Sequence, residues 1–227
     1  MTDVDEDVAA IEEILKSWFY EQAFIKVSKI GLYPILDAEM TLVANAVISR
    51  QREFSTGRWL ARQGLQQFGF PPQPIKMGKL RNPLWPDSVL GTISHDVDCC
   101  AVVLVKKQDF SGLGIGIDLV ALSQRAGKLD GLESMIMANM LELEAVDKLN
   151  LAVEPALLLF SIKESIIKAL SFYLDDFIDM RLIEIFYADK ILFKVSGCLV
   201  EGDIFSAITQ NYLLTAVNVY KINARIN

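Results

Sequence analysis

The sequence is poor in cysteine and has no long apolar run. Its three cysteines, Cys99, Cys100 and Cys198, show no C-x-x-C spacing, which argues against a zinc-type cluster. The longest strongly apolar run covers residues 99–105, whereas a membrane-spanning helix needs about 20 apolar residues. The first residues are acidic, unlike the basic start of a secretory signal. We therefore expect reduced thiols, no membrane span and a cytoplasmic protein.

The chain is acidic overall but basic in one stretch. A net charge of −7 over 227 residues argues against a general nucleic-acid binder. Residues 50–81, in contrast, hold seven arginines and lysines and a single acid, Glu53. A basic stretch in an acidic protein predicts a local site for a multiply charged anion, and a solvated helix face is the alternative explanation.

Periodicity predicts an α+β protein. Apolar residues recur every three or four positions in the helical regions, and β-branched and aromatic residues gather in the strand regions. The expected helices are residues 7–21, 40–68 (one helix or two abutting ones), 133–149 and 155–171, and the expected strands are residues 89–94, 99–107, 113–120, 182–188, 191–195, 204–209 and 212–220. Helices followed by strands occur twice, which predicts two similar α/β halves, residues 1–112 and 113–227, each with an antiparallel sheet and packed helices.

Three clusters of polar and aromatic residues stand out. The first, R-Q-R-E-F-S-T-G-R-W-L-A-R, runs from Arg50 to Arg62. The second, L-R-N-P-L-W-P, is followed by G-T-I-S-H, which ends at His95. The third combines G-I-D, ending at Asp118, with F-S-I-K-E-S-I-I-K-A-L, ending at Leu170. In this order and at these separations, the clusters resemble the 4′-phosphopantetheinyl transferase superfamily, in its enterobactin-synthase D-component or surfactin-type branch.

The resemblance implies an enzyme that moves the phosphopantetheine arm of coenzyme A onto a serine of an apo acyl, aryl or peptidyl carrier protein. Adenosine 3′,5′-bisphosphate would be released, and the product would serve siderophore, nonribosomal peptide or polyketide synthesis. The alternatives are a fatty-acid carrier-protein transferase and a non-catalytic coenzyme A-binding relative. In the larger family members two halves of one chain mimic a dimer, so we expect a monomer with two similar halves.

The resemblance also implies phosphate-binding residues in the first half. Arg50 and Arg58 match family positions on the 3′-phosphate of coenzyme A, and Ser94 and His95 match positions that contact its phosphates. Arginine forks suit phosphate oxygens. The alternatives are exposed helical arginines and a hydrogen-bonded core histidine. A Ser94–His95 hydrolytic pair is excluded, because neighbours on a strand point to opposite faces.

In the second half the resemblance implies a metal site. Asp118 and Glu164 match ligands of Mg²⁺ (or Mn²⁺), which favours one or two carboxylates together with substrate phosphates and waters. Lys163 and Lys168 are implied to lie near the phosphates, where Lys168 and His95 neutralise charge. Glu164 is the implied base for the serine proton. The alternative is an ordinary helical ion pair between Glu164 and Lys168.

The chain departs from the family pattern at two positions. Val120 stands where many relatives have a second acid two residues after the aspartate, and valine cannot bind metal, so a water would take that place. Val120 is also the feature that favours a non-catalytic relative. Met77 stands where some relatives have a lysine before the glycine, and Lys76 or Lys79 is the expected compensation.

The carrier protein needs a docking surface, and carrier domains are usually acidic. An acidic enzyme repels such a partner at long range, so docking is expected to be local and apolar. Residues 133–140 contain three methionines, which adapt to varied partners. We expect the patch there, with burial in the core as the alternative.

Overall fold

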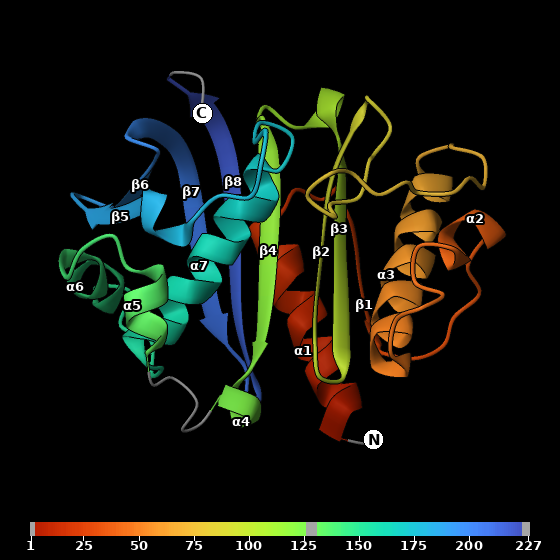
Figure 1. The fold of residues 1–227 in the computed structure, drawn as a ribbon, viewed down its shortest axis with the longest axis horizontal. Coiled ribbons are helices and arrows are strands. Elements are labelled where there is room, and N and C mark those ends of the chain that lie inside the picture. The colour runs from red at the N-terminus through yellow and green to blue at the C-terminus, as the bar shows by residue number, and fades with distance from the viewer. Residues whose placement is uncertain (1–2, 126–130, 224–227) are drawn as a thin grey trace. The chain divides into compact units, whose positions relative to one another are not determined.

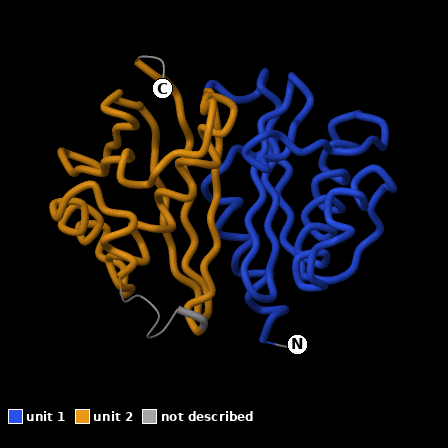
Figure 2. Tube along the Cα trace, in the orientation of Figure 1, with its two compact units in different colours: residues 1–111 blue, residues 112–227 orange. Residues whose placement is uncertain are grey.

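The computed structural model describes residues 3–125 and 131–223. The chain divides into two compact units, Met1–Ser111 and Gly112–Asn227 (Figure 2). Within the described ranges, no helix is both long and apolar enough to cross a membrane. The expected α+β class is confirmed, because each unit holds an antiparallel sheet and packed helices.

Unit 1 is built on a three-stranded antiparallel sheet in the order β1-β3-β2 (Figure 1). The central strand is buried along seven of its eight residues, which explains its continuous apolar sequence. Gly64 lets the long helix α3 approach the sheet, since a Cβ there would lie 2.5 Å from the ring of Phe24. The elements are α1 (Asp3–Trp18), β1 (Phe24–Lys29), α2 (Asp37–Met40), α3 (Ile48–Gln67), β2 (Val89–Asp96), β3 (Cys99–Lys106) and the 3-10 turn η1 (Lys107–Asp109).

Unit 2 is built on a five-stranded antiparallel sheet in the order β4-β8-β7-β6-β5, with α7 packed on β4 and β8 (Figure 1). Two glycines of β4 allow this approach. A Cβ at Gly116 would lie 1.9 Å from the carbonyl oxygen of Ser165, and one at Gly114 would lie 2.0 Å from that of Ala169. The elements are β4 (Gly114–Ala121), α4 (Leu122–Arg125), α5 (Leu132–Ile136), α6 (Leu141–Asp147), α7 (Pro155–Leu170), η2 (Met180–Leu182), β5 (Ile183–Tyr187), β6 (Ile191–Val195), β7 (Cys198–Ile208) and β8 (Tyr212–Ile222).

The predicted helix over residues 133–149 is wrong, because the chain forms two short helices, α5 and α6, instead. Side chains bond to the backbone where the helix would have continued. The Glu142 carboxylate accepts from the amide of Ala138, and the Asn139 side chain accepts from the amide of Leu141 at 3.0 Å. Such local bonds compete with helical ones and end the first helix.

Two strands also differ from expectation. Strand β1 was not predicted, and its burial does not alternate clearly along its six residues. Strand β7 begins at Cys198, six residues before the predicted start. Its first half includes the polar run from Glu201 to Asp203, and a register shift between Glu201 and Gly202 interrupts its pairing with β8.

Candidate active site

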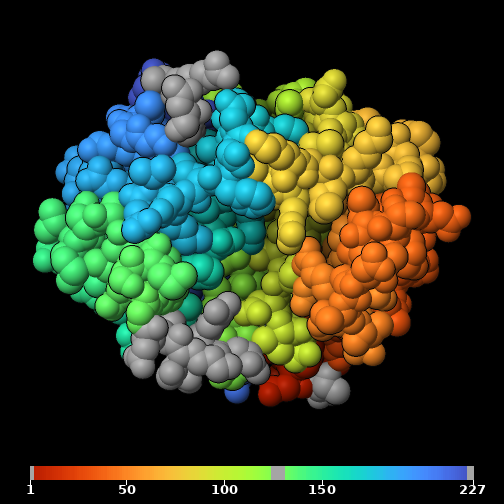
Figure 3. All heavy atoms as spheres, viewed as in Figure 1, coloured from red at the N-terminus to blue at the C-terminus, as the bar shows by residue number. Residues whose placement is uncertain are grey.

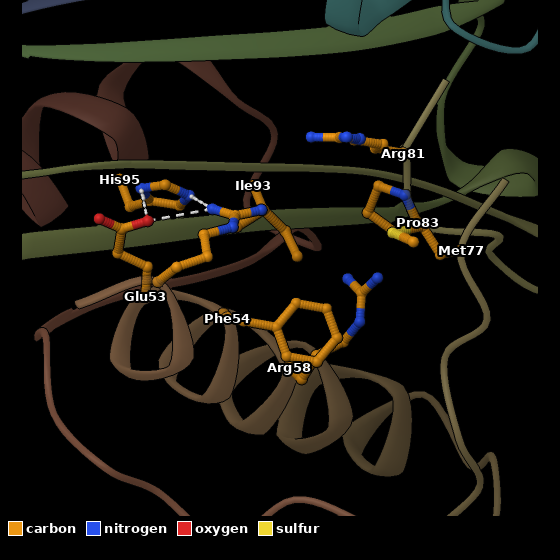
Figure 4. A pocket seen from close by; sticks show the side chains of 10 residues that line it. Glu53, Phe54, Arg58, Met77, Arg81, Pro83, Ile93 and His95 are labelled. Atoms are coloured by element: carbon orange, nitrogen blue, oxygen red, sulfur yellow. Dashed lines mark hydrogen bonds and ion pairs between the residues drawn. The ribbon is translucent and has the colours of Figure 1, made fainter. Parts of the chain in front are cut away.

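A cationic pocket of about 110 Å³ lies in unit 1, between α3, the loop that follows it and strand β2 (Figure 4). Its walls carry three arginines, one histidine and one carboxylate. The lining residues are Arg50, Glu53, Phe54, Gly57, Arg58, Met77, Arg81, Pro83, Ile93 and His95. The structure therefore brings together three of the four phosphate-binding residues expected in this half, namely Arg50, Arg58 and His95.

Helix α3 supplies one wall through residues three and four positions apart, which share a face. Arg50, Phe54 and Arg58 follow this spacing. Gly57 lies on the same wall, and a Cβ there would lie 3.0 Å from the side chain of Ile93 on β2. The absence of a side chain at Gly57 thus keeps the helix close to the strand that carries His95.

Arg58 is a buried cation without a full set of partners. The residue is only 4% exposed, and its Nε has no hydrogen-bond partner among the described residues. The guanidinium lies over the ring of Phe54, 4.7 Å from the centroid. Burial lowers the pKa of Arg58 to about 10; the charge of Glu39 opposes this, and Arg50 and Arg62 add to it. A bound anion would relieve the burial of this charge.

Glu53 and His95 lie next to each other at one side of the pocket (Figure 4), and Arg50 bonds to both. The Arg50 Nη1 donates to the Glu53 carboxylate at 3.0 Å and to His95 Nε2 at 2.8 Å. The His95 Nδ1 lies 3.6 Å from the same Glu53 oxygen. Ser94, next along β2, is only 3% exposed and is not among the residues that line the pocket.

The loop between α3 and β2 adds Arg81 to the pocket. Arg81 has a φ of 60°, in a left-handed region that is uncommon outside glycine. Its amide donates to the carbonyl of Gly78 at 3.0 Å, which closes a tight turn. Lys76 lines a different hollow beside Trp85, and Lys79 is not among the residues of the cationic pocket. The cation of this loop that lines the pocket together with Met77 is thus Arg81, a residue given no role from the sequence alone.

In unit 2 the structure joins Asp118 on β4 to Lys168 on α7, 50 residues later in the chain. The Lys168 Nζ donates to Asp118 Oδ1 at 2.7 Å and to the carbonyl of Ile117 at 3.1 Å. Asp118 is only 6% exposed. A lone carboxylate at this depth needs a cation or donors, and it has both.

Glu164 lies on the same helix within electrostatic range of this pair. Burial raises the pKa of Glu164; the Lys168 ammonium opposes the shift, and the Asp118 carboxylate adds to it. Two carboxylates therefore share the field of a single ammonium. The Lys168 ammonium thus bonds to Asp118 on β4, and its charge also acts on Glu164 one turn earlier on the same helix.

The donor set fits Mg²⁺ through two carboxylates, which suits an ion that takes its other ligands from phosphates and water. Among the described residues, no group of three or more His, Cys, Asp or Glu side chains could hold a metal. Val120, where a further acid would stand, is 1% exposed and belongs to the apolar core of unit 2. The fit is thus to an ion held mainly by substrate and solvent.

Buried hydroxyl groups hold the second oxygen of Asp118, and the sequence analysis missed them. Ser161 donates to Asp118 Oδ2 at 2.9 Å and lies 2.9 Å from the hydroxyl of Thr215 on β8. The Ser165 hydroxyl lies 2.8 Å from that of Thr215. The serines are visible in the F-S-I-K-E-S motif, but Thr215 is 54 residues away from Ser161 and carried no signal.

The Lys163 ammonium is buried among protein acceptors in unit 2, so the structure does not support its expected role near the phosphates. Its side chain is fully buried and its Nζ lies 2.8 Å from the Glu142 carboxylate. The ammonium also donates to the carbonyls of Ile136 at 2.7 Å and Met180 at 3.1 Å. Three donors thus meet three acceptors, and Lys163 ties α7 to α5, α6 and η2.

Two models of one family match the chain. Residues 38–105 match the 4′-phosphopantetheinyl transferase N-terminal domain, and residues 114–217 match the 4′-phosphopantetheinyl transferase superfamily. The two matched segments together cover more than half of the chain.

Curated relatives agree with these matches. A 4′-phosphopantetheinyl transferase of Mycobacterium tuberculosis is 38% identical over 85 residues, 37% of each chain. The enterobactin synthase component D of Escherichia coli K12 is 35% identical over 136 residues, 59% of this chain and 62% of that protein. The chain therefore spans less than two thirds of the length of these relatives.

Among solved structures, a holo-(acyl-carrier-protein) synthase from Bacillus anthracis in complex with coenzyme A (3′,5′-ADP) aligns with a TM-score of 0.36. It is 20% identical, and the alignment covers 48% of this chain and 96% of that one. Because both family models match, and relatives of the enterobactin-synthase D-component type are among the similar proteins, the chain belongs to the 4′-phosphopantetheinyl transferase superfamily.

Proposed function

We propose that the protein transfers 4′-phosphopantetheine from coenzyme A to a serine of an apo carrier protein and releases adenosine 3′,5′-bisphosphate. The observation that carries this proposal is Arg58. Its buried guanidinium, whose Nε has no partner in the part of the chain that the structure describes, lines a pocket with two more arginines, an arrangement that suits a bound phosphate. The 3′-phosphate of coenzyme A is the proposed occupant.

Arg50, Arg58 and His95 are the proposed ligands of that phosphate, with Arg81 as an addition. All four line the pocket in unit 1. Arginine forks bind phosphate oxygens in pairs, and histidine adds a donor when its ring nitrogen carries a proton. Ser94 stays a proposed contact to the coenzyme A phosphates through its position beside His95, although its side chain lies outside this pocket.

Asp118 and Glu164 are proposed to hold Mg²⁺ (or Mn²⁺) in unit 2. When bound, the ion would neutralise charge on the phosphate oxygens. Ser161 holds one oxygen of Asp118 at 2.9 Å, which fixes the direction of the carboxylate. Lys168, which now donates to Asp118, supplies a further positive charge for the pyrophosphate.

In the proposed reaction the serine hydroxyl oxygen attacks the β-phosphorus of coenzyme A. A bond forms between the serine oxygen and this phosphorus. The bond from the phosphorus to the bridging oxygen of the pyrophosphate breaks, and adenosine 3′,5′-bisphosphate leaves. Glu164 takes the hydroxyl proton, directly or through a water.

The decisive experiment is the intact mass of an apo carrier protein after incubation with the full chain, coenzyme A and Mg²⁺. With the wild-type enzyme the carrier protein should gain the mass of one phosphopantetheine. Glu164→Gln should slow this transfer by about two to four orders of magnitude. An exposed acid in unit 1, Glu13→Gln, is the control and should react at the wild-type rate. Full transfer by the Glu164 variant would remove both of its proposed roles.

Carriers of siderophore, nonribosomal peptide or polyketide synthesis are the proposed partners, with fatty-acid carriers as the second candidate. Parallel incubation with both carrier types separates them. Met135 and Met140 are 70% and 68% exposed, and α5 and α6 lie on the visible surface of unit 2 (Figure 3). This surface is the proposed docking patch, whereas Met137 packs against the core. Tight binding of coenzyme A without transfer to any carrier would instead favour the non-catalytic relative.

A further inference from the structure

Glu53 is the one carboxylate among the described residues that line the cationic pocket. A negative charge at this place repels a phosphate, so Glu53 must have a role other than direct binding of the anion. Glu53 lies one turn after Arg50 on α3, and its side chain is 28% exposed. It faces the ring of His95 across the pocket edge (Figure 4).

The bonds around His95 fix how its two ring nitrogens are used. Arg50 has only donors, so the Nε2 that lies 2.8 Å from its Nη1 must act as an acceptor. The proton of the neutral ring then sits on Nδ1, which faces Glu53 at 3.6 Å. The carboxylate has only acceptors, so it favours this arrangement.

A bound phosphate requires Nε2 to act as a donor instead of an acceptor, because phosphate oxygens only accept hydrogen bonds. The ring could shift its proton from Nδ1 to Nε2, but a bare Nδ1 would then face the Glu53 carboxylate. Taking up a second proton avoids this, because both nitrogens become donors. The phosphate then bonds to Nε2, and the imidazolium Nδ1 faces a carboxylate.

We infer that Glu53 is a positioning residue that holds Arg50 and His95 at the pocket edge and makes phosphate binding take up a proton on His95. The inference rests on the proposed binding of the 3′-phosphate in this pocket. The charged groups that line the pocket with His95 are Arg50, Glu53 and Arg58 of α3 and Arg81 of the loop between α3 and β2. Asp96 follows His95 on β2, and Cys100 is its register partner on β3.

The test is calorimetric titration of the full chain with coenzyme A and with 3′-dephospho-coenzyme A, in buffers of different ionisation enthalpy. Slightly above neutral pH, where free imidazoles are mostly uncharged, wild type should take up close to one proton with coenzyme A and none with the dephospho form. Coenzyme A should also bind at least about tenfold more tightly than the dephospho form.

Three variants sharpen the result. Glu53→Ala should weaken coenzyme A binding by about tenfold and leave dephospho-coenzyme A unchanged. Glu53→Gln should bind coenzyme A nearly as wild type but without proton uptake, because the amide can donate to a bare Nδ1. Glu13→Ala removes the same charge from an exposed position on α1 and should change neither value. Thermal melting of each variant checks that it is folded.

The outcomes separate the two proposals. If wild type binds both nucleotides equally, the proposed 3′-phosphate site and the role of Glu53 are both wrong, whereas transfer itself is judged by the intact-mass experiment. If wild type discriminates but Glu53→Ala binds coenzyme A unchanged or more tightly, only the role of Glu53 is wrong. Equal weakening for both nucleotides, or proton uptake retained by Glu53→Gln, also overturns that role.

Discussion

Two buried cations, one in each unit, show how burial alone fails to reveal a function. Lys163 is fully buried, and its ammonium meets a carboxylate and two carbonyls. Arg58 is nearly as buried, but its Nε has no partner among the described residues and its side chain lines a pocket. A satisfied buried charge belongs to the fold, whereas one left unsatisfied indicates a ligand.

Helix α3 repeats the contrast within one turn. Arg62, four residues after Arg58, pairs with the fully buried Glu39, which lies 23 residues earlier in the chain. Glu39 also accepts from the amide of Ile75 at 3.0 Å. Arg62 thus joins α3 to α2 and, through Glu39, to the segment of Ile75, whereas Arg58 on the same helix face lines the pocket.

The largest effect expected from this contrast is on stability. Lys163→Met leaves Glu142 buried without its cation and should lower the free energy of unfolding by about 3–5 kcal/mol in urea titrations. Adding Glu142→Gln should recover part of the loss, since the amide oxygen still accepts a bond. The folded fraction should bind coenzyme A as wild type. Normal stability with lost affinity would return Lys163 to the phosphate site.

Arg58→Met should have the opposite pair of effects, with a large loss of coenzyme A affinity and no loss of stability. Coenzyme A affinity should fall by about 100-fold in calorimetric titrations. The free energy of unfolding should stay level or rise, because burial disfavours the charge of Arg58, as its lowered pKa of about 10 records. Arg52→Met, an exposed arginine on the same helix, is the control. A large loss of stability would make Arg58 another structural cation.

Arg81 tests which cation compensates for Met77. Arg81→Ala should weaken coenzyme A binding by about tenfold, because its side chain lines the pocket. Lys76→Ala and Lys79→Ala should each change it by less than about threefold. The reverse order of effects would support the compensation expected from the sequence.

The smallest effect expected is that of Glu164 on the free energy of unfolding, and its sign follows from the raised pKa of this carboxyl. The folded chain holds this proton more tightly than the unfolded chain. The resulting stabilisation is complete below the ordinary glutamate pKa and is lost as pH rises through the raised value. Glu164→Gln should therefore match wild type at acidic pH and exceed its unfolding free energy by less than about 1 kcal/mol at neutral pH. A variant less stable at neutral pH would contradict the shift.

The sequence predicted the regular parts of the molecule well. The strongly periodic helix over residues 155–171 and the apolar strands over residues 89–94 and 99–107 are present within a few residues. The break between α5 and α6 was missed because Glu142, which accepts locally from the amide of Ala138, also accepts from the distant amide of Ile185 at 2.8 Å. Such a bond joins distant segments and leaves no local pattern.

The candidate site divides in the same way. Motif order brought out Arg50, Arg58, His95, Asp118 and Lys168, and the structure places the first three in one pocket and the last two in one ion pair. Two lysines of the same motif nevertheless lie in different surroundings. The side chain of Lys163 points into the core of unit 2, whereas that of Lys168, five residues later, reaches Asp118.

The sequence by itself determined the α+β class, the family and the set of residues from which a phosphate and metal site could be built. Tertiary structure alone decided which charges in that set are already neutralised. Glu39 and Arg62 are 23 residues apart, Glu142 and Lys163 are 21 apart, and Asp118 and Lys168 are 50 apart. The energy of a charge depends on its burial and on partners brought close by folding, and neither is written in the local sequence.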